Sequence, residues 1–275
     1  MATVVSTALA GNDAGASAPS LQVGRGPRRR RAMYSIIAGL VAWELIGRFI
    51  LTDRILFAPF SQVMVVLWEL TASGEIWAHL AASATEFFLG FALASGVGIG
   101  MGVLMGRFAI VRDYADPWVS ILYSSPLVAL MPFYLLLFGV GLVSKVAIVF
   151  TVSIFPILLN TYVGVTSTDR HHLDVARAFC CGSWHTFVKV EIPSALPFII
   201  TGLRLGLGRG LTGVVVGEMF SARAGLGYLI ASAGQSFDAA KVLAGVLLFT
   251  IAGYGMMNFL SWLGRRLAPW RAEGR

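Results

Sequence analysis

Six long apolar segments constrain this chain more than any other feature of its sequence. Each holds about twenty residues or more, the length a helix needs to cross a hydrocarbon core of about 30 Å. Backbone groups in lipid must be hydrogen-bonded within the protein, so such segments form helices or closed barrels. The period-two alternation of barrel strands is absent. We therefore predict an all-α membrane protein with spans at about 33–52, 80–106, 117–139, 143–165, 196–221 and 241–264.

Composition agrees with a membrane environment. Of 275 residues, 57% are hydrophobic and 13% charged, whereas an ordinary soluble domain is about 25% charged. A soluble fold with so few charges would expose much apolar surface to water. Residues 1–32 are rich in small and basic residues and lack a periodic apolar pattern, so we expect a disordered basic tail. The membrane-spanning domain is then 33–270, followed by a short tail at 271–275.

The basic residues predict the orientation of the spans. With a cytosolic N-terminus, fourteen Lys and Arg residues fall in inside segments, and four fall outside: Arg54, Lys145, Arg223 and Lys241. Cytosolic loops of membrane proteins carry such an excess. We predict that both termini are cytosolic, and that the net charge of +7 reflects topology and not nucleic-acid binding.

No catalytic or cofactor motif is present. The sequence lacks a His-Glu-x-x-His motif, a Gly-x-Ser-x-Gly elbow and the Gly-Lys-Ser/Thr of a phosphate-binding loop. We expect no enzyme activity, metal or cofactor on this chain, and any ATP must be bound by another polypeptide. The four histidines are interpreted as solvated loop residues: His79, His171, His172 and His185.

Small residues and prolines within the spans predict how the helices pack. Gly98, Gly102 and Gly106 recur every four residues on one helix face, where a second helix can approach closely. Three prolines are expected to bend their spans: Pro126, Pro132 and Pro156. In the outside loop, the apolar run 63–68 predicts a short interfacial helix.

Charged residues inside the spans are the candidates for a translocation pathway. An ionisable residue at a helix centre costs about 2.5–3.5 kcal/mol on insertion scales, so it should face protein or water. Glu44 can pair with Arg48 four residues later. Arg209 lies near mid-membrane, either as the structural partner of a glutamate such as Glu44 or as an attractor of an anionic substrate. The full set of candidates is Arg209, Arg204, Glu218 and Glu44.

The inside loop at about 166–195 has the pattern of two short amphipathic helices with a turn near Cys181–Ser183. Pro193 is expected to end the second helix. A structured, partly apolar element on the cytosolic side is a natural docking surface for a soluble partner.

This loop resembles the cytoplasmic loop of the permeases of binding-protein-dependent ABC importers. Asp174 and Ala176 match the Glu and second Ala of the family's Glu-Ala-Ala motif, and Cys180 stands at its Gly, with Gly182 nearby to serve the turn. Val190, Ile192 and Pro193 match the Ile-x-Leu-Pro ending. Four further stretches resemble the nitrate, sulfonate and taurine branch: 156–161, 195–197, 201–204 and 225–230.

The resemblance implies a type I importer in a bacterial inner membrane. Two permease copies, expected to be identical, would bind two cytosolic ATPase subunits holding ATP-Mg, and an external binding protein would deliver a small oxyanion or sulfonate such as nitrate, bicarbonate or taurine. Asp174 would pair with a basic residue of the ATPase, and Ala176 would be small because the contact is close. The implied coupling residues are Asp174, Val175, Ala176, Phe179, Cys180, Gly182, Trp184 and Pro193.

Two other classes of protein share some of these features. A stand-alone secondary transporter or channel also fits charged and bent spans, but it would need coupling-ion ligands or internal repeats. A membrane enzyme lacks any clustered site here. Dependence of transport on ATP separates the importer from the stand-alone transporter.

Overall fold

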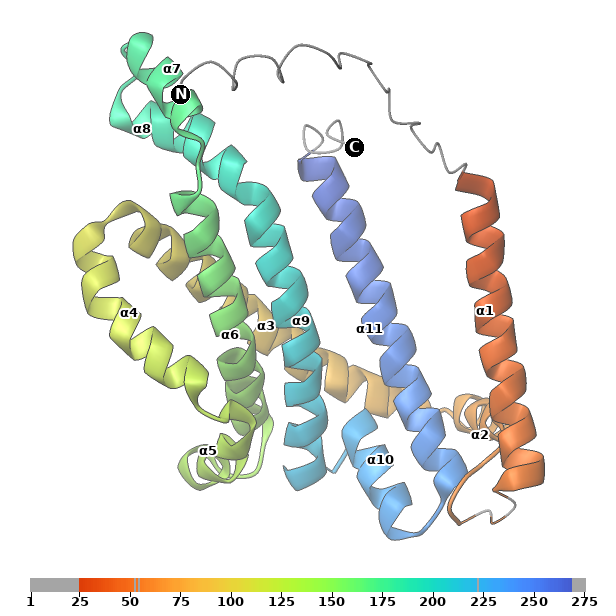
Figure 1. The fold of residues 1–275 in the computed structure, drawn as a ribbon. Coiled ribbons are helices and arrows are strands. Elements are labelled where there is room, and N and C mark those ends of the chain that lie inside the picture. Colours follow the sequence, from red (N-terminus) through yellow and green to blue (C-terminus); the bar gives the residue numbers. More distant parts are fainter. Residues whose placement is uncertain (1–24, 52, 54, 222, 269–275) are drawn as a thin grey trace, which may run out of the picture. The chain divides into compact units, whose positions relative to one another are not determined.

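The computed structural model describes residues 25–51, 53, 55–221 and 223–268, and in them all regular structure is helical (Figure 1). The predicted all-α class is confirmed. The chain divides into two units, Met1–Trp43 and Glu44–Arg275, with the boundary inside α1 (Arg25–Leu45). Helix α1 begins within the tail predicted for 1–32, and the predictions for 1–24 and 271–275 lie outside the described residues.

Five helical stretches of the described chain are long and apolar enough to cross a membrane. They are Met33–Ile50, which ends in a π-helix at Ile46–Ile50, then α3 (Glu75–Arg107), α6 (Leu142–Thr166), Ser183–Phe220 and α11 (Ala239–Leu267). Ser183–Phe220 comprises α8 (Ser183–Thr186), the π-helix η3 (Phe187–Glu191) and most of α9 (Ile192–Ser221). These stretches match five of the six predicted spans.

The third predicted span, 117–139, is not one continuous helix. Helix α4 (Ala109–Ser124) ends at Ser125, and a 3₁₀ turn (Leu127–Leu130) leads into α5 (Met131–Phe138), with a bend of 85° between the two halves. Pro126 cannot donate a backbone hydrogen bond, and it holds Ser125 in an extended conformation with ψ of 149°. Pro132 then lies in the first turn of α5, where proline is favourable. Pro156 lies inside α6, which continues through it.

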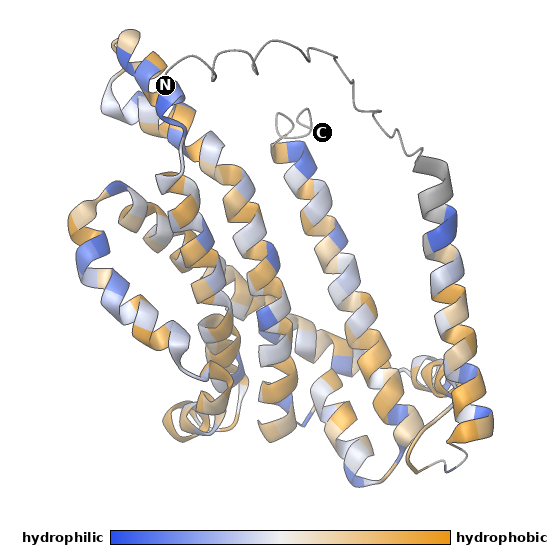
Figure 2. Ribbon diagram, in the orientation of Figure 1, coloured by the Kyte–Doolittle hydropathy of each residue, from blue (hydrophilic) through white to orange (hydrophobic). Residues whose placement is uncertain are grey.

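Two shorter helices lie between the long ones. Helix α2 (Phe60–Ala72) contains the predicted interfacial run 63–68, so that prediction of a helix is confirmed. Helix α10 (Leu226–Gln235) follows α9. In Figure 2 the long helices are mostly hydrophobic, and hydrophilic residues gather in α7 (Arg170–Ala178).

The sequence predicted that Pro193 ends the second helix of the inside loop, and this prediction is wrong. The chain stays helical from Ser183 to Ser221. A proline ring normally clashes with the carbonyl four residues earlier. Here η3 widens the helix just before the proline, with the Ile192 N–H bonded to the Phe187 carbonyl five residues back. We attribute the continuation through Pro193 to this wider turn.

The core is built on close contacts of α6 with α3 and α9. A Cβ atom placed on Gly98, Gly102 or Gly106 of α3 would lie 2.6–3.1 Å from atoms of α6. On the other side of α6, glycines of α9 approach equally closely: Gly202, Gly206, Gly210 and Gly213. The predicted packing role of the α3 glycines is confirmed, because only a residue without a side chain leaves room for this separation.

We predict that Gly102→Ala destabilises the protein and Gly100→Ala does not. A Cβ at Gly102 would lie 2.6 Å from both the Leu158 carbonyl oxygen and Thr161 Cβ, whereas nothing lies within 4 Å of one at Gly100. Overpacking of this kind costs about 1–3 kcal/mol. Thermal unfolding of the two purified variants in detergent measures the difference, and equal midpoints would contradict the packing we describe.

Candidate functional site

The inside loop folds as a helix, a tight turn and a second helix. The Asp169 carboxylate caps α7 by accepting the His171 N–H at 2.9 Å. The Cys181 N–H then bonds to the Ala176 carbonyl at 3.0 Å, and Cys180 between them has φ of +51°. This left-handed residue at a helix end is the position that favours glycine. Cys180 therefore makes the turn itself, and Gly182, with φ of −62°, serves as the residue before α8.

The turn presents large apolar side chains outward. Val175 is 55% exposed, Phe179 79% and Trp184 72%. Asp174 is also exposed and accepts a hydrogen bond from Arg177 Nη1 at 3.1 Å. Ala176, by contrast, is buried in the chain. We call Asp174, Val175, Phe179 and Trp184 the coupling surface.

A groove lies beside the coupling surface. It has a volume of about 400 Å³ and runs between the face of α7 that carries Val175 and Phe179 and the start of α9 at Pro193. Pro193 thus lines the groove without ending a helix. The groove and the coupling surface together form a concave, partly apolar face on the predicted cytosolic loop.

A buried polar cluster lies at the other end of α3. Glu218 of α9 is 1% exposed, and its carboxylate accepts hydrogen bonds from Ser83 Oγ and from the Gly227 N–H, each at 2.5 Å. Ser83 Oγ in turn accepts the Leu226 N–H at 2.9 Å. Three consecutive backbone N–H groups at the start of α10 therefore bond to side chains, because the Gly225 N–H bonds to His79 Nδ1 at 2.9 Å.

Glycine is required where this loop wraps the Glu218 carboxylate. Gly225 has φ of +131°, and a Cβ on it would lie 2.3 Å from the carboxyl carbon of Glu218. Glu218 was a pathway candidate, but its contacts hold the α9–α10 connection against α3. The Gly225–Ile230 stretch carries part of the family resemblance, and no sequence signal links it to Ser83 or His79.

Lys145 and His79 lie elsewhere than the sequence suggested. Lys145, counted as an outside-loop charge, is buried in the first turn of α6 and forms an ion pair with Glu86, which is also buried. His79, interpreted as a solvated loop residue, is 8% exposed within α3. The other three histidines are exposed. Within the described ranges, His, Cys, Asp and Glu form no group of three or more that could hold a metal ion.

Arg209 lies on an open face of α9. Its side chain is exposed, as are Thr201, Leu205 and Thr212 on the same face, and among the described residues it has no hydrogen-bond or ion-pair partner. Arg204 is half-buried, and its Nε atom is buried without a hydrogen-bond partner. Arg209 is therefore free to meet an anion or a neighbouring chain on this face.

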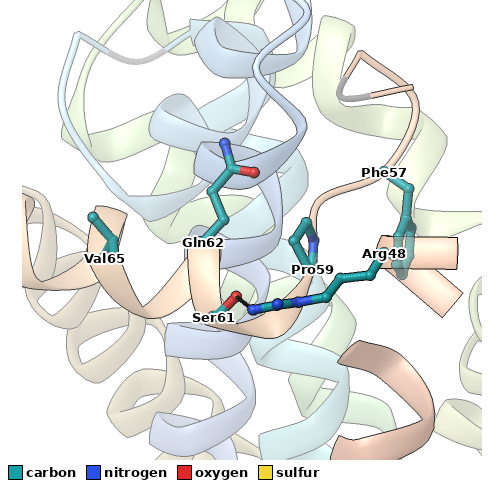
Figure 3. Close-up of a pocket in the computed structure, with 7 residues that line it drawn as sticks. Arg48, Phe57, Pro59, Ser61, Gln62 and Val65 are labelled. Atoms are coloured by element: carbon teal, nitrogen blue, oxygen red, sulfur yellow. Dashed lines mark hydrogen bonds between the residues drawn. The ribbon is translucent and has the colours of Figure 1, made fainter. Parts of the chain in front are cut away.

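Glu44 has a structural role in the described chain. Its carboxylate pairs with Arg48 at 2.5 Å and accepts the Ser61 N–H at 2.9 Å, which caps the N-terminus of α2. Arg48 also reaches Ser61 Oγ at 3.5 Å, across a cavity of about 670 Å³ at the start of α2 (Figure 3). The predicted Glu44–Arg48 pair is confirmed. No hydrogen bond or ion pair joins Glu44 to Arg209 in this part of the chain, so the interpretation of Arg209 as the partner of Glu44 is not supported.

The sequence of this chain is similar to those of a known protein family. Residues 94–270 match the model of the binding-protein-dependent transport system inner membrane component. The putative aliphatic sulfonates transport permease of Bacillus subtilis is 34% identical over 84% of each chain. The taurine transport system permease of Escherichia coli is 32% identical over 85% of this chain and 87% of its own.

The fold is also similar to that of a transporter of known structure. The inward facing structure of the MetNI methionine ABC transporter superposes with a TM-score of 0.54 at 22% identity, over 73% of this chain and 94% of that one. The fold is thus that of a type I ABC importer permease. The chain therefore belongs to the binding-protein-dependent transport system inner membrane components, and it is a membrane-spanning permease subunit of an ABC importer.

Proposed function

We propose that two copies of this chain form the translocation pathway for a small sulfonate-like anion, driven by two separate ATPase chains docked on the coupling surface. The observation that carries the proposal is the outward presentation of Phe179 and Trp184 on a short structured loop. Large aromatic side chains on a water-exposed loop are costly unless a partner covers them, and aromatic residues dominate the energetics of interfaces.

The charge pattern supports a cytosolic position for this surface. With the coupling surface inside, both termini are also cytosolic, and the inside segments hold fourteen of the basic residues. The ATPase binds ATP-Mg in the cytosol, so a docking surface on that side is where the energy source is present. The groove beside Pro193 accepts part of the ATPase.

The open face of α9 supports an anionic substrate. Arg209 carries an uncompensated positive charge within a span, and two threonine hydroxyls lie on the same face, at Thr201 and Thr212. The guanidinium of Arg209 can donate to the oxygens of a sulfonate, whereas the Thr201 and Thr212 hydroxyls already donate to backbone carbonyls of α9. The names of the Bacillus subtilis and Escherichia coli relatives, which give aliphatic sulfonates and taurine, point to the same class.

We predict that Asp174→Arg abolishes docking of the ATPase. The variant replaces an exposed carboxylate of the coupling surface with a cation, which would face the basic residue of the ATPase. The measurement is the amount of ATPase that co-purifies with the permease expressed in its own host. Arg177→Ala is the matched control, because it breaks the same Asp174–Arg177 pair and leaves the carboxylate in place.

Retained docking in Asp174→Arg would contradict the assigned surface. Equal loss in both variants would assign the effect to the pair within α7. An exposed pair contributes only about 0–1 kcal/mol to stability, so neither variant should unfold the loop.

We predict that Arg209→Gln lowers uptake of taurine or an alkanesulfonate at least about tenfold, since a hydrogen bond to a charged group contributes about 1.5–3 kcal/mol. The assay is ATP-driven uptake by the permease reconstituted with its ATPase and binding protein. Arg209→Lys keeps the charge and should retain part of the uptake. Arg48→Gln, which removes an arginine at the end of another span, is the control and should transport normally.

Normal uptake by Arg209→Gln at normal assembly would exclude Arg209 from the pathway. Loss of the assembled complex in both Arg209 variants would make the residue structural. Uptake by the wild type without ATP would instead favour the stand-alone transporter.

A further inference from the structure

The C-terminal end of α3 is bound to the helix that follows the inside loop. We call this loop, at about 166–195, the coupling loop. Arg107, the last residue of α3, donates from Nη1 to Glu191 Oε1 at 3.3 Å. The guanidinium carbon of Arg107 also lies 5.9 Å from the centroid of the Phe187 ring. One arginine thus contacts two residues of η3 that lie four positions apart, by an ion pair and by a cation–π contact.

The ion pair between Arg107 and Glu191 provides the counter-charge of a buried carboxylate. The Glu191 side chain is 12% exposed, and among the described residues Arg107 is the only partner of its carboxylate in an ion pair or side-chain hydrogen bond. A buried carboxylate that loses its counter-charge is strongly unfavourable. Arg107 and Glu191 are therefore expected to stay together when either helix moves.

A continuous chain of side chains links this contact to the coupling surface. The ring centroids of Trp184 and Phe187 are 5.8 Å apart, and Trp184 itself is 72% exposed on that surface. Since α8, η3 and α9 form one continuous helix, a displacement of Trp184 is carried to Phe187 and Glu191.

The opposite end of α3 holds the buried polar cluster. At 33 residues, α3 is roughly 50 Å long at 1.5 Å per residue. Its first turns carry His79 and Ser83, which bind the start of α10, and Glu86, which pairs with Lys145 of α6. Both ends of this one helix are therefore joined to other elements by polar contacts, which are buried at one end and partly buried at the Arg107 end.

We propose that Arg107 and Glu191 are positioning residues that transmit movement of the coupling loop to α3, and through α3 to the polar cluster that holds the α9–α10 connection. This inference rests on the proposed docking of the ATPase at the coupling surface. The pair contacts neither ATP nor substrate, so its contribution is to the ratio of transport to ATP hydrolysis.

The test is a charge exchange measured as substrate transported per ATP hydrolysed. The permease variants Arg107→Glu, Glu191→Arg and the double exchange are reconstituted with the ATPase and binding protein, and docked ATPase, hydrolysis and taurine uptake are measured on each. We expect each single variant to keep docking and hydrolysis and to lose about fivefold or more in transport per ATP, the lower end of typical coupling between sites. The double exchange restores the pair and should recover most of the ratio.

Controls separate this inference from the proposed function and from a structural role. Arg112→Glu disrupts an exposed ion pair with Asp113 in α4 and should leave the ratio unchanged. Singles with a wild-type ratio, a double variant no better than the singles, or uptake and hydrolysis that fall in proportion would each overturn the positioning role. Failure of the wild-type permease to bind any ATPase would instead overturn the proposed function.

Discussion

The close approach of α3 and α9 to α6 is the constraint on which the rest of the structure depends. In lipid there is no hydrophobic force between helices, so contact between them must come from tight packing and from polar groups. Glycines supply the packing along both faces of α6, with Gly102 and Gly206 each close enough to exclude a methyl group. Because these contacts extend along much of the spans, the three helices are expected to move as one body.

Polar contacts sit at the two ends of this body and not in its middle. Arg107 and Glu191 join it to the helix of the coupling loop, and Ser83 and Glu218 join it to the start of α10. In the middle of α9, Arg209 has no hydrogen-bond or ion-pair partner within the part of the chain that the structure describes. This distribution agrees with the proposed docking of a partner at one end of the body and the proposed passage of an anion beside Arg209.

Much of the fold could be predicted from sequence because span length and glycine spacing are local properties. The Glu44–Arg48 pair was predictable for the same reason, since both residues lie on one helix. The Lys145–Glu86 pair and the bond from the Gly225 N–H to His79 were not, because each joins segments more than fifty residues apart. The break at Pro126 and the continuation through Pro193 were not distinguishable from the sequence, because helices of this chain also continue through Pro156 and Pro197.

The central claim is that α3 and α9 move together during the transport cycle. The most direct test is the distance between spin labels at Leu93 of α3 and Met219 of α9, both exposed, with Cys180 and Cys181 replaced by serine. Labelled chains are diluted with unlabelled ones in the reconstituted transporter, and the distance is measured with and without ATP. We predict the same distance distribution in both states. A distribution that changes with nucleotide would contradict a single rigid body.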